Sequence, residues 1–266
     1  MDLKKLSNNL RFSIIKMSNK AKAPHLASSL SCIDIVATLY HSVLKVNKKN
    51  FKSSLRNRFI LSKGHAAAAL YVALEYKKII TKKDLNSYTK KGSLLEEHPS
   101  PKLLGVEAAT GSLGHGLSIG CGIALSSKIN KQKFMTYVLM SDGECNEGSV
   151  WEAALFASAK KLNNLCAFVD YNKWQATGKS TEVLKLGSLT KKFYQFGWNV
   201  LEIDGHNHNL IYKACKVAIK EKSKPTIVIA NTIKGKGISF MENDNNWHYR
   251  IPSDEEVKFA KKELKI

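Results

Sequence analysis

An aspartate and an asparagine follow two apolar runs in the middle of the chain. Asp142 follows the run over 134–140, and Asn172 follows a second run over 165–169, with a helical pattern between the two runs. A carboxylate and a neutral amide oxygen suit a hard cation such as Mg²⁺. This ion takes one or two protein carboxylates and completes its octahedron with oxygens of water or phosphate.

The two apolar runs and the helical pattern between them predict a strand–helix–strand crossover, which is right-handed in almost all proteins. Its strands are then parallel and adjacent, so Asp142 and Asn172 both lie at carboxyl ends. Open α/β sheets bind their ligands at that edge. We therefore expect a site for a metal ion and a phosphate at the edge of a doubly wound, mostly parallel sheet with helices on both faces.

Helical and strand patterns alternate along the whole chain, and no repeat or long linker divides it. We therefore predict one α/β domain over residues 1–266. Three Ser-x-x-Asp/Glu patterns, at Ser31, Ser149 and Ser253, resemble capping boxes and predict helix starts. Helices are expected over 3–17, 33–44, 66–76, 82–88, 116–127, 188–196 and 208–221, and strands over 58–62, 134–140, 165–169, 198–203 and 226–230.

The chain is strongly basic, with 42 Lys+Arg against 22 Asp+Glu and a formal net charge of +20. Counterion release would favour a nucleic-acid partner. The basic residues are scattered in pairs, however, and no basic stripe with interleaved aromatics or known nucleic-acid motif is present. We interpret the charge mainly as a solvated surface that attracts anionic substrates.

The five cysteines form no C-x-x-C pair, and most lie in apolar runs. Reduced thiols of this kind are typical of a cytoplasmic protein. Neither a signal peptide nor a transmembrane or lipidation motif is recognised. The expected location is the cytoplasm, with no membrane association.

A glycine-rich segment, Gly111-Ser112-Leu113-Gly114-His115-Gly116, precedes a helical pattern. Glycines allow a backbone to approach a phosphate closely, and helix N-termini favour anions. Taken alone, a glycine-rich turn before a helix more often reflects tight packing than a cofactor site. The segment is not a G-x-G-x-x-G fingerprint and the chain contains no P-loop, which argues against NAD and ATP.

Residues 141–153, SDGECNEGSVWEA, followed by Asp170-Tyr171-Asn172, resemble the thiamine diphosphate motif of transketolases. Other segments fall in the order of that family: KAPH at 22–25, LSKGHA at 61–66, EHP at 97–99, GVE at 105–107, TGSLG at 110–114, KGKG at 234–237 and WH at 247–248. The resemblance covers about residues 10 to 250 and only the first, diphosphate-binding half of a transketolase. The pyrimidine-binding and C-terminal domains have no counterpart.

The resemblance implies a set of ligands for thiamine diphosphate and Mg²⁺. The metal ligands would be Asp142, Asn172 and the main-chain carbonyl of Trp174, where the identity of the side chain matters little. The cofactor-binding residues would be Ser28, Lys63, His65, Gly111, Ser112, Leu113, Gly143, Asn172, Gln175, Lys234 and His248. Taken alone, Asp142 would be an ordinary cap at a strand-to-helix turn, and each lysine would be a solvated residue.

Four histidines and one glutamate are the implied catalytic residues. His25, His65, His98 and His248 fall on motifs whose histidines surround the thiazolium and the sugar, and imidazole exchanges protons near neutral pH. Each of them alone would be an ordinary surface or core histidine. Glu147 resembles a residue that couples two active sites across a dimer interface, although an acid near a helix N-terminus also has a plain structural explanation.

The resemblance implies transfer of a two-carbon ketol unit from a ketose, or ketose phosphate, to an aldose acceptor. The chain would be the N-terminal subunit of a split transketolase, with a partner subunit that carries the pyrimidine-binding half, in a dimer of heterodimers. The glutamate that activates the cofactor would lie on this partner, so the isolated chain should be inactive. Two alternatives stay open: a subunit of a 2-oxo-acid dehydrogenase, and a non-catalytic basic binding protein on the same fold.

Overall fold

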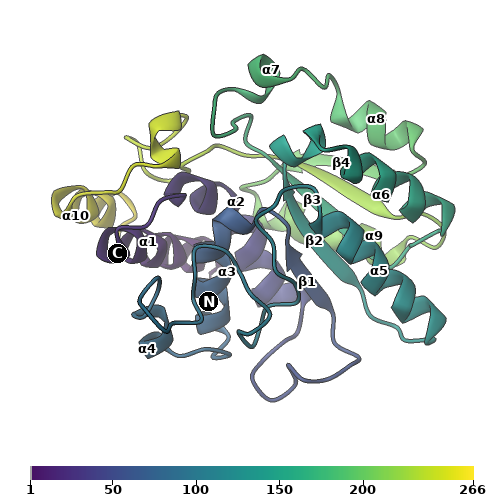
Figure 1. Cartoon of the computed structure of the whole chain (residues 1–266), viewed down its shortest axis with the longest axis horizontal. Helices are drawn as coiled ribbons and strands as arrows, with labels where there is room; N and C mark the ends of the chain where they lie inside the picture. The colour runs from purple at the N-terminus through teal and green to yellow at the C-terminus, as the bar shows by residue number, and fades with distance from the viewer. Residues whose placement is uncertain (1) are drawn as a thin grey trace.

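Five parallel strands form one sheet in the order β1-β2-β3-β5-β4 in the computed structural model, which describes residues 2–266 (Figure 1). The strands are β1 (Arg58–Leu61), β2 (Thr136–Ser141), β3 (Leu165–Tyr171), β4 (Asn199–Asp204) and β5 (Thr226–Asn231). β2 and β3 are parallel neighbours, with Ser141 opposite Asp170. The predicted crossover and the parallel sheet are therefore confirmed.

Helices precede, connect and follow the strands. They are α1 (Leu3–Ala21), α2 (Leu26–Thr38), α3 (Ala67–Tyr76), α4 (Lys82–Leu85), α5 (Gly116–Ile129), α6 (Gly148–Ala159), α7 (Ser180–Val183), α8 (Leu189–Gln195), α9 (His208–Lys220) and α10 (Asp254–Glu263). Short helical turns are η1 (Leu39–Val43), η2 (Gly64–Ala66), η3 (Gly143–Asn146) and η4 (Asn245–His248). Between α4 and α5 the chain is irregular, as expected.

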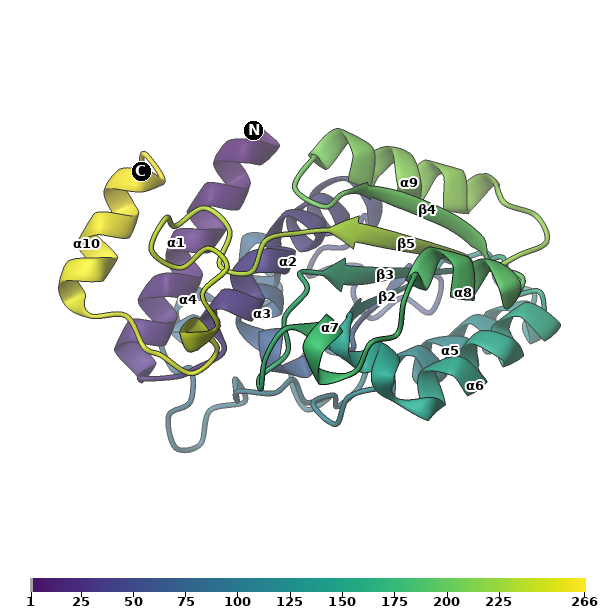
Figure 2. The same cartoon turned by 90° about the horizontal axis from the view of Figure 1, so that it is seen from above.

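The sheet separates two hydrophobic cores. Alternate residues of a strand point to opposite faces, so Tyr137 and Leu139 of β2 join the core with α1, α2, α3 and α9, whereas Val138 and Met140 join the core with α5, α6 and α8. Figure 2 shows α9 on one face of the sheet and α5 and α6 on the other. Because both faces are covered, the strands are apolar on both sides, as in other parallel sheets.

Helix α2 is the most deeply buried element, and all 13 of its residues are buried. Together with η1 it forms the stretch Leu26–Val43, which is long and apolar enough to span a membrane, with a mean hydropathy of 1.3. Within the protein 89% of this stretch is already buried, against α1, α3 and α9. Core packing therefore accounts for its apolar composition.

Two of the three predicted capping boxes are wrong. α2 begins at Leu26, so Ser31 lies inside it and donates its hydroxyl to Asp170 Oδ2 at 2.6 Å. Ser149 lies inside α6 and donates to the carbonyl of Gly114 at 3.0 Å. In both places the serine hydroxyl makes a hydrogen bond to a residue distant in sequence instead of capping a helix. The box at Ser253 is confirmed, with Ser253 and Glu256 bonding each other's backbone N–H.

Candidate active site

The carboxyl ends of four strands converge on one edge of the sheet. Lys63 follows β1, Asp142 follows β2, Asn172 follows β3 and Lys234 follows β5. The N-terminus of α2 meets the same edge, because the N–H of its cap residue, His25, donates to the carbonyl of His248 at 2.8 Å. The fold thus brings together residues more than 200 positions apart in the sequence, such as His25 and His248.

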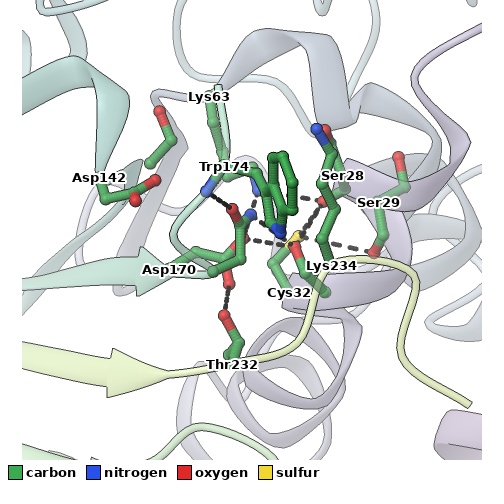
Figure 3. A network of polar contacts seen from close by, with 12 residues as sticks. Ser28, Ser29, Cys32, Lys63, Asp142, Asp170, Trp174, Thr232 and Lys234 are labelled. Carbon is green, nitrogen blue, oxygen red and sulfur yellow. Dashed lines mark hydrogen bonds and ion pairs between the residues drawn. The ribbon is translucent and has the colours of Figure 1, made fainter. Parts of the chain in front are cut away.

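Asp170, the last but one residue of β3, is the centre of a buried polar network (Figure 3). Lys63 and Thr232 reach its carboxylate from opposite sides, and both Asp170 and Lys63 are fully buried. Burial alone would raise the pKa of Asp170, but the adjacent ammonium of Lys63 outweighs it and holds this pKa below its ordinary value. Lys63 also donates to the carbonyl of Ser28 at 3.0 Å, which joins β1 to α2.

The same network orients the amide of Asn172. Its Nδ2 donates to Asp170 and to Ser31, each at 3.2 Å, which turns Oδ1 the other way; Oδ1 accepts from the N–H of Trp174 at 3.0 Å. Asn172 therefore presents an oxygen, and this is the atom that a hard cation needs.

Asp142 is buried at the end of β2 beside a cavity of about 200 Å³, which Tyr171 and Ser180 also line. Its Oδ2 accepts from the Ser180 hydroxyl at 2.7 Å. Burial raises the pKa of Asp142 to about 6. Residues 2–266 contain no group of three or more His, Cys, Asp and Glu side chains that would hold a metal by themselves. A metal here would need the amide and main-chain oxygens and a ligand's own oxygens.

The four predicted catalytic histidines lie together. The ring of His25 is 5.1 Å from that of His248, 5.8 Å from His65 and 6.1 Å from His98, between ring centroids. His25 has a left-handed backbone with a φ of +64°, which is uncommon outside glycine and aims its ring at the other three. Burial lowers the pKa of His25 to about 4 and that of His248 to about 3, so both are neutral at pH 7.

Lys234 donates hydrogen bonds to this cluster and to the residues around it. Its ammonium donates to His248 Nδ1 at 3.1 Å and to Asn245 Oδ1 at 2.6 Å. With Nδ1 accepting, neutral His248 carries its proton on Nε2. Burial and the charge of Lys63 lower the pKa of Lys234 to about 8. Lys234 also lies 3.4 Å from the carbonyl of Gln175, so it connects the histidines with the loop that follows Asn172.

Two of the predicted glycines permit close contacts within the site. A Cβ on Gly111 would lie 2.5 Å from His98 Cδ2, and a Cβ on Gly143 would lie 3.1 Å from Gln175 Cγ. Gly111 also has a φ of +148°. Ser112 and Leu113 continue this loop, which packs beside the histidine cluster through Gly111, while their carbonyls face the ring of His115.

Among the predicted catalytic residues, Glu147 lies apart from the four histidines. It is exposed at the N-terminus of α6 and contacts Gly114, where an added Cβ would lie 2.6 Å from Glu147 Cβ. A site on an exposed helix end fits contact with another chain rather than with the histidines.

Glu144, whose carboxylate is fully buried, was not predicted from the sequence to be a site residue. It accepts from the hydroxyl of Ser62, from the N–H of Gly114 at 3.0 Å and from the N–H of Ser141 at 2.9 Å. Burial raises the pKa of Glu144. One side chain thus joins the loop after β1, the glycine-rich loop and the turn after β2. An acidic residue next to Asp142 and Gly143 was the only signal in the sequence.

The site has polar atoms that suit thiamine diphosphate. His25 Nδ1 and Gln175 Nε2 are buried without a hydrogen-bond partner within residues 2–266, and such atoms are rare in folded proteins unless a ligand meets them. Gly111 and Gly143 let the side chains of His98 and Gln175 pack close to the backbone, which draws these two side chains into the site. Asp142 and Asn172 offer oxygens for a metal that binds phosphate. The residues present therefore fit this cofactor.

Comparisons with known proteins agree with this chemistry. The family model "Transketolase, thiamine diphosphate binding domain" matches residues 3–266. An apulose-4-phosphate transketolase subunit of Phocaeicola vulgatus is 39% identical over 258 residues, which are 97% of this chain and 92% of that protein. The 6-deoxy-6-sulfo-D-fructose transketolase subunit SqwG of a Clostridium species is 37% identical, over 99% of this chain and 96% of its own length.

Among solved structures, transketolase of Campylobacter jejuni superposes with a TM-score of 0.94 at 31% identity. The match covers 100% of this chain and 43% of that one, so this chain spans less than half of a solved transketolase. The family model and the two relatives cover nearly every residue. The chain therefore belongs to the transketolase family, as its thiamine diphosphate-binding domain.

Proposed function

We propose that this chain is the thiamine diphosphate-binding subunit of a two-chain transketolase, which moves a two-carbon ketol unit from a ketose to an aldose. The observation that carries the proposal is the histidine cluster at the carboxyl edge of the sheet, with ring centroids 5.1 to 6.1 Å from His25. A core-packing role would not need three imidazoles around the buried His25 Nδ1, which has no hydrogen-bond partner within residues 2–266. A sugar substrate with several hydroxyls would use such a group of imidazoles as hydrogen-bond donors and acceptors.

Asp142, Asn172 and the carbonyl of Trp174 are the proposed ligands of Mg²⁺, and the N–H of Gly143 is proposed to bind the diphosphate. The support is chemical: a single carboxylate, an amide oxygen held outward by Asp170 and a main-chain oxygen leave room for phosphate oxygens. Lys63, Gln175, Lys234 and the loop from Gly111 to Leu113 would surround the rest of the cofactor, with Ser28 held close by Lys63.

Thiamine diphosphate, when bound, supplies the carbon nucleophile that breaks and forms the carbon–carbon bonds. The chain's own part is to bind sugar hydroxyls and to move protons. Neutral His248 carries its proton on Nε2, because Lys234 donates to Nδ1, so it would donate a hydrogen bond to a substrate oxygen. His25, His65 and His98 would bind neighbouring hydroxyls and carbonyl oxygens. Because their lowered pKa keeps His25 and His65 neutral at pH 7, each has one ring nitrogen that can accept a hydrogen bond from a substrate hydroxyl.

A partner chain would supply the pyrimidine-binding half. Two relatives with subunit names match this chain over 92% and 96% of their own lengths, whereas the Campylobacter jejuni enzyme carries more than twice as much chain. We propose a dimer of heterodimers, with Glu147 at an interface between chains. The five cysteines are all buried and free, which supports a reducing compartment such as the cytoplasm.

The proposed donors are ketoses with an anionic group at the far end of the carbon chain. The names of the two relatives specify apulose 4-phosphate and 6-deoxy-6-sulfo-D-fructose, and both sugars are of this kind. A chain with a formal net charge of +20 would also attract such anions.

The test is two-carbon transfer to ribose 5-phosphate by the chain together with the proposed pyrimidine-binding subunit from the same organism. The donors are xylulose 5-phosphate and the two sugars above, with thiamine diphosphate and Mg²⁺ present. We expect transfer from at least one donor by the pair and none after EDTA removes the metal. The variant D142N should lose thiamine diphosphate binding in calorimetry. The control is N199D, which makes the reverse exchange of Asn for Asp at the start of β4 and should keep this binding. Decarboxylation of a 2-oxo acid by the pair without two-carbon transfer from any sugar, or no cofactor binding by the pair, would contradict the proposal.

A further inference from the structure

Tyr249 lies at the rim of the histidine cluster. Its ring centroid is 4.7 Å from that of His248 and 5.8 Å from that of His25, and both pairs meet edge to face. Although it packs against two rings, 62% of Tyr249 is exposed. The side chain therefore closes one side of the cluster and presents the rest of its surface to solvent.

The backbone beneath Tyr249 is firmly held. The preceding carbonyl, of His248, accepts from the N–H of His25, and the N–H of Tyr249 donates to Asn246 O at 3.2 Å. Trp247 is fully buried, with Nε1 donating to Phe240 O at 2.8 Å. The guanidinium of Arg250 covers the Trp247 ring at 4.2 Å. An exposed ring on such a backbone presents its surface at little entropic cost when a ligand binds.

Tyr249 supplies a kind of surface that the rest of the cluster lacks. The neighbouring side chains His25, His248, Lys234 and Asn245 offer hydrogen-bonding groups, whereas a sugar also presents C–H groups along its carbon chain. A tyrosine ring packs against such groups, and its hydroxyl donates or accepts at the polar end. No hydrogen bond among residues 2–266 engages this hydroxyl.

We propose that Tyr249 is a specificity-determining residue that contacts the sugar substrate. Its ring packs against the C–H groups of the substrate beyond the carbons that the histidines bind, and its hydroxyl hydrogen-bonds to a sugar oxygen. This inference rests on the proposed function, because it assumes that the histidines bind a sugar. Tyr249 would then select among sugar donors. The names of the two relatives specify different donors, and a residue of this kind would account for such a difference.

The test compares Y249F and Y249A with wild type in the complete two-subunit enzyme. Loss of one hydrogen bond in Y249F should raise the KM for the best donor about three- to tenfold. Y249A also loses the ring contact, so its KM should rise further, and the relative kcat/KM values for xylulose 5-phosphate, apulose 4-phosphate and 6-deoxy-6-sulfo-D-fructose should change. In both variants kcat should change less than KM, and the affinity for thiamine diphosphate should stay as in wild type.

Y194A is the matched control, because Tyr194 is 67% exposed on α8, away from the cluster. It should leave the KM and the order of donors unchanged. An unchanged KM in Y249A would overturn the inference while the proposed function stands. The inference would also be wrong if Y249A only raised the partner concentration needed for half-maximal activity, since Tyr249 would then contact the partner chain. Absence of transfer by the wild-type pair from every donor would contradict the proposed function itself, and the inference with it.

Discussion

Single side chains hold the loops of this site in place, and Glu144 is the clearest case. Its carboxylate is buried without an ion pair among residues 2–266, and it accepts from donors on three separate segments. A buried charge is unfavourable unless hydrogen bonds compensate for it. The hydrogen bonds from Ser62, Gly114 and Ser141 do so, and they fix the glycine-rich loop relative to Asp142.

The variant E144Q tests this role. It keeps the shape of the side chain but replaces one acceptor oxygen with an N–H₂ group that faces a donor. We expect the free energy of unfolding, measured with urea, to fall by about 1–3 kcal/mol. E147Q is the matched control three residues away: Glu147 is exposed, so its change should stay within about 0.5 kcal/mol. Equal stability of E144Q and wild type would show that the hydrogen bonds of Glu144 do not hold these loops in place.

The site was predictable where chemistry follows from residue type and spacing, and not where it depends on distant donors. Asp142 and Asn172 follow apolar runs, so a parallel crossover brings them to one edge. The histidine cluster and Lys234 came only from the family resemblance, because no local pattern joins positions 25 and 248. Glu144 was missed because its partners Ser62 and Gly114 lie 82 and 30 residues away. Tyr249 carried no signal at all.

At the scale of elements, close backbone approach sets where the loops can lie. A Cβ on Gly64 in η2 would lie 2.4 Å from the carbonyl oxygen of Thr110, whereas Gly122 in α5 has open space around it. We therefore expect opposite effects from the same substitution. G64A should lower the free energy of unfolding by about 1–3 kcal/mol, because rigid backbone must move. G122A should raise it by about 0.5–1 kcal/mol, because alanine favours a helix interior.

Thermal or urea unfolding of both variants measures these two changes. A neutral G64A would mean that the segment at 110–111 moves freely against η2, and that the cofactor loop is less fixed than the structure indicates.

Most elements were predicted to within a few residues, because their apolar periodicity agrees with how they pack. The start of α2 was not. The Ser31 pattern suggested a cap, but burial of Leu26 and Leu30 extends the helix back to His25. Only the tertiary bond from Ser31 to Asp170 explains the serine, and it joins residues 139 positions apart. Such a contact depends on the fold and not on the local sequence.

At the scale of the whole molecule, the buried histidines make stability depend on pH. His25, His65 and His248 have lowered pKa values in the folded chain, chiefly through burial, against 6.5 when exposed. Between pH 6.5 and about 4 the unfolded chain therefore binds more protons than the folded one. The free energy of unfolding should fall as the pH is lowered through this range.

Urea unfolding at pH 7.5, 6.5 and 5 measures this dependence, and the double variant H25N/H248N isolates it from the carboxylates. The variant should lose less stability than wild type between pH 6.5 and 5, since asparagine takes up no proton. The same loss in both proteins would show that these histidines are already protonated in the folded chain.

The most direct measurement of the central claim is a titration of the partner chain into a fixed concentration of this chain. Two-carbon transfer is followed with thiamine diphosphate and Mg²⁺ present and the best donor saturating. We predict no transfer by either chain alone and a plateau at one partner per chain. Full two-carbon transfer by this chain alone would contradict the account. So would the absence of transfer at every ratio of the two chains, with every donor tried, although the pair binds the cofactor.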